Sequence, residues 1–157
     1  MPRHAEVRRL PYTAAQMFDL VADVARYPEF RPWNSAARIR SRKPVMGGEL
    51  MEADLVISFK VFRESFGSRV TLLPGQGRIL TDYLDGPFKH LHSVWAFADR
   101  PEGGSEVNFT VDFEFRNAIL AGVIGLVFNE AMARVVRAFE ARAKALYGAT
   151  EGGKPGV

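Results

Sequence analysis

The sequence contains no cysteine among its 157 residues. This absence excludes a disulfide framework, thiolate catalysis and cysteine-ligated metal sites, and it suits a reducing compartment. The N-terminal MPRHAEVRRL has no signal-peptide pattern, and the longest apolar run, Ala118 to Phe128, is too short to span a bilayer. We therefore expect a cytoplasmic protein, with peripheral contact at an inner membrane as its closest approach to lipid.

The sequence also lacks a strong excess of charge of one sign. The formal net charge is +3, with 25% charged and 47% hydrophobic residues, which is ordinary for a soluble globular domain. A mild basic excess is a weak indicator of partners, and nothing in it points to DNA. We expect one domain over residues 1–148, followed by a flexible tail at 149–157.

Motifs for catalysis and metal binding are missing too. There is no phosphate loop and no nucleophile elbow. His90 and His92 share one face of a predicted strand, but no third ligand follows at a recognisable spacing, which favours a solvated face over a metal site. Two further pairs could serve acid–base chemistry, although nothing separates them from solvated charges: Asp23 with Tyr27, and Glu64 with Ser65.

What the sequence does contain is alternation of apolar and polar residues, the mark of half-buried strands. The clearest example is Glu106 to Phe115, in which every second residue is apolar. Turn-forming Gly, Pro and Asp separate the strands at hairpin spacing, which predicts an antiparallel meander. The predicted strands cover residues 6–10, 35–42, 51–60, 62–73, 78–84, 88–98 and 106–115.

Two helical sections interrupt this pattern. Thr13 and Gln16 form a capping box that opens a short helix, and Tyr27-Pro28 should end it. The segment from Tyr27 to Trp33 is stiff and aromatic; it is either a rigid plug at one end of the core or an aromatic rim at a ligand cavity.

The second helical section, Asn117 to Tyr147, predicts one long helix of roughly 45 Å. Its first half is apolar on all sides and contains Gly122 and Gly125. Such a half is either buried all round or covers something apolar that is not protein.

These elements predict an α+β fold of about seven strands, in which a strongly curved antiparallel sheet wraps around the C-terminal helix. A curved sheet bends away from a helix further than side chains can fill, so we expect a cavity between them. Because the inward rows of the strands carry no charged residue, a ligand in that cavity should be apolar.

One outward strand face is basic, with Arg38, Arg40 and Arg42 in alternation. Arg8, Arg9 and Lys43 would enlarge this patch if the first two strands were neighbours. The patch is either an ordinary solvated face or a contact surface for anionic lipid or RNA.

The run from Met17 to Trp33 (MFDLVADVARYPEFRPW) resembles the START-like coenzyme Q-binding proteins of the polyketide cyclase-like superfamily, a family that includes the ribosome-association toxin RatA. Further matching segments follow in family order, so that the resemblance covers about residues 5–148: 65–71, 85–89, 95–97, 111–115, 138–143 and Leu146-Tyr147. Where the family often has an aliphatic residue, this chain has Arg31.

The resemblance implies a helix-grip (START/Bet v 1-like) fold and a non-enzymatic role in cellular respiration. The protein would hold a polyprenyl quinone or a related lipid, supporting respiratory electron transport or quinone synthesis. Ubiquinone would be its bound ligand, with no further cofactor and no metal. Its carbonyl oxygens need one or two donors, which Tyr27, Trp33 and Ser93 could supply. The residues expected to contact it are Phe18, Val21, Tyr27, Phe30, Trp33, Leu55, Ile57, Phe88, Trp95, Phe109, Phe113, Val123 and Val127.

Two alternatives remain open at this point. A ribosome-associating inhibitor of translation like RatA would bind the large ribosomal subunit through the surface of Arg38, Arg40 and Arg42. A cyclase or aromatase would need a polar group with a shifted pKa inside the cavity, such as a buried Asp or His.

Overall fold

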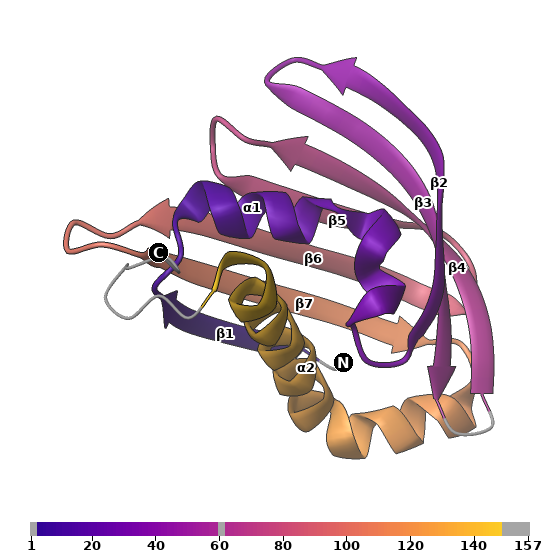
Figure 1. The fold of residues 1–157 in the computed structure, drawn as a ribbon. Helices are drawn as coiled ribbons and strands as arrows, with labels where there is room; N and C mark the ends of the chain where they lie inside the picture. Colours follow the sequence, from indigo (N-terminus) through magenta and orange to yellow (C-terminus); the bar gives the residue numbers. More distant parts are fainter. Residues whose placement is uncertain (1–2, 60–61, 149–157) are drawn as a thin grey trace.

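The computed structural model describes residues 3–59 and 62–148, and the predicted tail at 149–157 lies outside them. Its seven strands form one antiparallel sheet in the order β1-β7-β6-β5-β4-β3-β2, curved around the C-terminal helix (Figure 1). The elements are β1 Arg3–Leu10, α1 Ala14–Ala22, the 3-10 helix η1 Val24–Glu29, β2 Asn34–Val45, β3 Gly48–Phe59, β4 Phe62–Leu73, β5 Arg78–Asp85, β6 Phe88–Asp99, β7 Ser105–Phe115 and α2 Ala118–Tyr147.

The predicted capping box begins α1. The Thr13 hydroxyl accepts a hydrogen bond from the Gln16 amide at 3.1 Å, and the Gln16 side chain accepts one from the Thr13 amide at 2.9 Å. The helix ends at Ala22, and the chain continues as η1, which contains Tyr27 and Pro28. Tyr27-Pro28 therefore lies within a second short helix, and α1 ends at Ala22, before the predicted stop at this pair.

Alternation of burial follows the sequence pattern most clearly in β7, where every odd-numbered residue from Ser105 to Phe115 is buried. This row faces the second half of α2, whose buried residues include Val135, Phe139 and Ala143. Successive side chains of a strand point to opposite faces, so the sheet has one apolar concave face and one charged convex face. The predicted strands are thus confirmed, with ends that differ by a few residues.

The long helix is not straight, which corrects the expectation of a single rod. Ala118–Leu126 and Phe128–Tyr147 meet at 71°, and the bend is visible where α2 turns along the bottom of Figure 1. Gly122 and Gly125 precede the bend and face open space, so no packing there opposes it. Each glycine weakens a helix by about 1 kcal/mol relative to alanine, which makes this the place where α2 breaks.

The first segment of α2 has apolar residues both on its buried side and on its exposed side. Leu120 is buried against the sheet, whereas Ile119 and Leu126 are 74% and 88% exposed. No single helix among the described residues is long and apolar enough to cross a membrane, although the two bent segments together pass that test by length and composition.

Replacement of Phe97 by alanine should destabilise the fold strongly. Its ring is buried between Phe18 of α1 and Trp95, with ring centres 5.9 and 6.0 Å away. Loss of that ring should lower the free energy of unfolding by about 3–5 kcal/mol in urea denaturation. Leu126→Ala, at an exposed position, is the control and should change it by less than about 0.5 kcal/mol. Equal effects of the two substitutions would contradict this packing.

Candidate functional site

A cavity of about 160 Å³ lies between the concave face of the sheet and the bent helix α2. Inward residues of β3 to β7 form its floor, η1 and the start of β2 form one wall, and Leu120, Ile124, Met132 and Val135 of α2 form its roof. An engineered protein cavity of roughly 150 Å³ accepts benzene. The space therefore suits one six-membered ring, with further room only where the rim opens.

Most residues predicted to contact the ligand do line this cavity. They are Tyr27, Trp33, Leu55, Ile57, Phe88, Trp95, Phe109 and Phe113. They come from η1, the residue before β2 and three strands (β3, β6 and β7), which the sheet curvature brings together. The lining was predictable because strand parity decides which side chains point inward.

Four predicted contact residues lie elsewhere. Phe18 is buried against Phe97 beneath α1, and Val21 is fully buried in the same helix. Phe30 packs behind Tyr27 on Phe139, with ring centres 5.2 Å apart. Val123 is 36% exposed, because the bend turns its side of α2 outward. The side chain of the remaining predicted residue, Val127, lies outside the described part of the chain.

The cavity floor carries three hydroxyl groups that sequence reasoning found only in part. Thr81 pairs with Ser93 across β5 and β6, and Ser68 lies on β4, two positions from the partner of Thr81. None of the three side chains hydrogen-bonds to another described residue. Only Ser93 was expected as a donor; the inward parity of Ser68 and Thr81 was the available signal. Together they offer hydrogen bonds to an oxygen-bearing ligand inside an apolar space.

The rim is charged, contrary to the expectation that no charged residue faces inward. Arg31 and Glu64 both line the cavity. Glu64 has the inward parity of β4, but it lies near the strand's start, where the sheet meets solvent and the residue is exposed. Arg31 is half-buried, with its guanidinium carbon 5.0 Å from the ring centre of Tyr27. Charge is thus confined to the edge, where water can still reach it.

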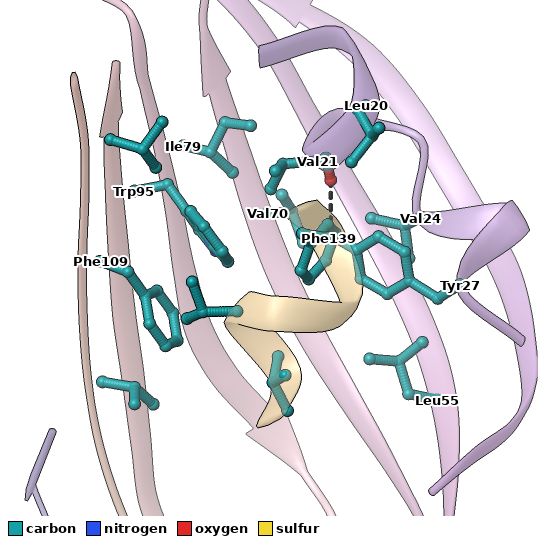
Figure 2. Packing of buried hydrophobic residues seen from close by; sticks show 14 of the residues in the cluster. Leu20, Val21, Val24, Tyr27, Leu55, Val70, Ile79, Trp95, Phe109 and Phe139 are labelled. Atoms are coloured by element: carbon teal, nitrogen blue, oxygen red, sulfur yellow. Dashed lines mark hydrogen bonds between the residues drawn. The ribbon is translucent and has the colours of Figure 1, made fainter. Parts of the chain in front are cut away.

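Tyr27 fixes the η1 wall to the core. Its hydroxyl donates a hydrogen bond to the backbone oxygen of Val21, drawn as the dashed line in Figure 2, and its ring packs edge-on against Phe139 at 5.4 Å. Burial raises the pKa of Tyr27 to about 12, with Arg31 acting against that shift and Asp23 with it. The tyrosine is therefore a neutral donor near pH 7 and unsuited to act as a base.

The next residues hold a strained turn at the cavity mouth. Trp33 has a φ of 62°, a left-handed conformation that costs an L-residue roughly 1–2 kcal/mol. The guanidinium of Arg134 lies 6.0 Å from its ring centre. Strain of this kind persists only where surrounding contacts hold it, and it often marks a ligand site.

The predicted basic patch is not an open cationic surface. β1 and β2 lie at opposite edges of the sheet, so Arg8 and Arg9 are far from the arginines of β2. Ion pairs neutralise those arginines: Arg38 with Asp54, Arg40 with Asp54 and Asp85, and Arg42 with Glu49. The sequence hid this arrangement because the acidic partners lie on other strands or at a hairpin.

The histidines of β6 also have acidic neighbours. Nδ1 of His92 lies 2.7 Å from an oxygen of Asp82, and Nε2 of His90 lies 3.4 Å from one of Asp112. Within residues 3–59 and 62–148, no group of three or more His, Asp or Glu side chains has the geometry to hold a metal ion. The described cavity lining likewise contains no histidine or aspartate.

A family model described as "Polyketide cyclase / dehydrase and lipid transport" matches residues 10–140. The chain belongs to this family. Among curated members, it is similar to the ribosome association toxin RatA of Pseudomonas aeruginosa, with 37% identity over 88% of this chain and 93% of the relative. It is also similar to the mitochondrial coenzyme Q-binding protein COQ10 homolog B of Xenopus laevis, with 30% identity over 94% of this chain and 60% of the relative.

Two solved structures agree with the fold. An 18 kDa protein of Caulobacter crescentus, CC1736, is 34% identical over 95% of this chain and all of its own, with a TM-score of 0.78. A START superfamily protein of Mycobacterium smegmatis matches at a TM-score of 0.76 over 92% of this chain and 98% of its own, at 16% identity. The predicted START-like helix-grip fold is confirmed.

The ionisation of Tyr27 should make stability fall at high pH. A buried tyrosine with a pKa near 12 resists ionisation in the folded state, whereas an unfolded one ionises near 10. Its stabilising contribution is therefore complete below pH 10 and lost as pH rises through 12, a change of about 2–3 kcal/mol. Denaturant unfolding along this pH range should show a shallower fall for Tyr27→Phe than for the unmodified protein. Identical slopes would show that Tyr27 is not protected from ionisation.

Proposed function

We propose that this protein binds a polyprenyl quinone, with ubiquinone as the reference ligand, or a closely related lipid, and that it catalyses no reaction on it. The observation that carries this proposal is an apolar cavity of ring size whose floor has three hydroxyls without a side-chain hydrogen bond to any other described residue. Membership of a family whose description includes lipid transport beside polyketide cyclases and dehydrases supports lipid binding, and so does similarity to a coenzyme Q-binding protein.

The chemistry of a quinone matches the cavity in two respects. Its flat ring can pack against Trp95 and Phe109, whose own ring centres are 4.3 Å apart, and its carbonyl oxygens can accept hydrogen bonds from Ser68, Thr81 and Ser93. These hydroxyls face the cavity, so a ligand carbonyl that reaches them can accept hydrogen bonds in an apolar surrounding. The prenyl tail would then leave along the apolar residues of the roof and rim.

The one carboxylate among the described lining residues, that of Glu64, is exposed at the rim, and this placement supports a role in binding rather than catalysis. A cyclase needs a residue that takes up or gives a proton near pH 7. Tyr27 stays protonated there, and the guanidinium of Arg31 stays charged. We propose that the protein works in the cytoplasm and reaches the inner membrane only at its surface, where it would exchange the ligand.

Filling the cavity should abolish quinone binding without unfolding the protein. Ser93→Leu places a branched side chain in the centre of the floor and removes one hydroxyl, so the dissociation constant for a short-chain ubiquinone should rise at least about tenfold. Quenching of tryptophan fluorescence measures it, because Trp95 lines the cavity. His92→Leu, the neighbouring residue on the convex face, is the matched control. Unchanged binding to Ser93→Leu would place the ligand elsewhere.

Association with the ribosome is a second candidate, favoured by the 37% identity to RatA proteins over nearly the whole chain. In this candidate the large ribosomal subunit would bind a surface outside the cavity. The arginines of β2 contribute little to it, because their carboxylate partners already neutralise them. Arg116 and Arg134, which have no carboxylate partner within residues 3–59 and 62–148, would carry more of the contact with RNA phosphates.

Co-sedimentation with large ribosomal subunits tests the second candidate. The protein should pellet with subunits at low salt, and raising the salt should release it steeply, as expected for phosphate contacts. Arg116→Gln with Arg134→Gln should weaken the association more than Arg38→Gln with Arg42→Gln, while Ser93→Leu should leave it intact. A protein that stays in the supernatant at low salt would rule this candidate out.

A further inference from the structure

Arg31 stands at the rim of the cavity with its charge unpaired. It lines the cavity and is half-buried, so its guanidinium lies where the apolar space meets solvent. Two rings flank the guanidinium carbon: Tyr27 at 5.0 Å and Phe139 at 6.0 Å from the ring centres. Among the described residues, no carboxylate oxygen lies within ion-pair distance of it.

The carboxylates nearest to it in sequence have other partners. Glu29 binds Arg142 at 2.7 Å and Arg26 at 3.3 Å, and Asp23 binds Arg26 at 3.2 Å. Arg142 makes an instructive contrast, since it also stacks on an aromatic ring, that of Phe30 at 5.1 Å, but has Glu29 as its partner. Of these two stacked arginines, only Arg31, which lines the cavity, has no carboxylate partner among the described residues.

An arginine in this setting is costly without an anion. Burial lowers the pKa of Arg31, which reports that its charged form has lost solvation. The guanidinium still remains charged at any physiological pH, so the cost is not relieved by deprotonation. Stacking on two rings offsets part of this desolvation cost. A bound carboxylate or phosphate would offset more of it by accepting hydrogen bonds from paired N–H groups of the guanidinium.

We infer that Arg31 is a headgroup site, and that the cavity takes an amphiphile whose carboxylate or phosphate pairs with this guanidinium while its apolar part fills the space beneath. The inference rests on the proposed lipid-binding function, and it favours an acidic lipid over the neutral quinone as the ligand of the same cavity. A neutral quinone would occupy the same space but would leave this charge unpaired.

Hydrogen bonds fix the backbone of Arg31 before a ligand arrives, and the rings of Tyr27 and Phe139 flank its guanidinium. The Arg31 amide donates to the Tyr27 oxygen at 2.8 Å, and the Asn34 amide donates to the Arg31 oxygen at 3.4 Å. Between them lies the strained turn at Trp33. A preorganised donor costs little entropy when it binds, which favours a specific headgroup contact over a casual surface charge.

The test compares ligands that differ only in the headgroup. Dodecanoate and dodecanol should be titrated calorimetrically at neutral pH into the full-length protein, Arg31→Leu, Arg31→Lys and Arg63→Leu. The unmodified protein should bind the acid about tenfold more tightly than the alcohol, and Arg31→Leu should lose that preference while binding the alcohol unchanged. Arg31→Lys should keep part of the preference for the acid, and Arg63→Leu, which removes an exposed charge, should keep all of that preference.

Each outcome decides the matter. If the acid and the alcohol bind equally, or if Arg31→Leu keeps the preference, the headgroup site is overturned while lipid binding in the cavity stands. If acetate competes as well as dodecanoate, Arg31 binds free anions independently of the cavity, and the inference is again wrong. If neither amphiphile nor a short-chain ubiquinone binds any of the proteins, the proposed function fails together with it.

Discussion

Phe139, near the middle of the second segment of α2, joins parts of the molecule that are far apart in the sequence. Its buried ring lies 5.1 Å from Trp95 of β6, 5.4 Å from Tyr27 of η1 and 5.2 Å from Phe30, and Figure 2 shows it between the first two. The contact holds the helix over the concave face and fixes the aromatic segment beside it. The cavity, its mouth and the position of Arg31 all depend on this anchor.

The cavity arises because one helix cannot fill the space enclosed by a seven-stranded curved sheet. The second segment of α2 packs tightly through Val135, Phe139 and Ala143, whereas the first segment bends away at 71°. Between the two segments and the floor, side chains leave room for a ring. The second segment of α2 therefore stabilises the fold, while the helix as a whole forms the roof of the cavity. This arrangement explains why a cavity remains in an interior with so many aromatic residues.

The polar groups of the site are arranged by depth. Hydroxyls on neighbouring strands lie on the floor, and a guanidinium and a carboxylate lie at the rim. A low-dielectric interior penalises charge more than neutral dipoles, so this order is the one expected for a site that accepts lipids. The convex face follows the opposite rule, with arginines and carboxylates of adjacent strands paired in solvent. Similarity to both a ribosome association toxin and a coenzyme Q-binding protein is compatible with one fold that offers a cavity and a surface.

The sequence by itself determined the strands, the capping box at Thr13 and the inward rows that became the cavity floor, because alternation and local hydrogen bonding act between residues close in the chain. Three features were decided only by the tertiary structure. The bend of α2 follows two glycines, Gly122 and Gly125, that face open space instead of a packed neighbour. The basic patch is neutralised because Asp54, Asp85 and Glu49 form ion pairs with its arginines across strands. The open charge of Arg31 depends on Glu29 turning to Arg142, a residue far along the chain. Each of these features is a contact, or a missing contact, between segments that are far apart in the sequence. Local sequence patterns do not determine which distant segments pack against each other.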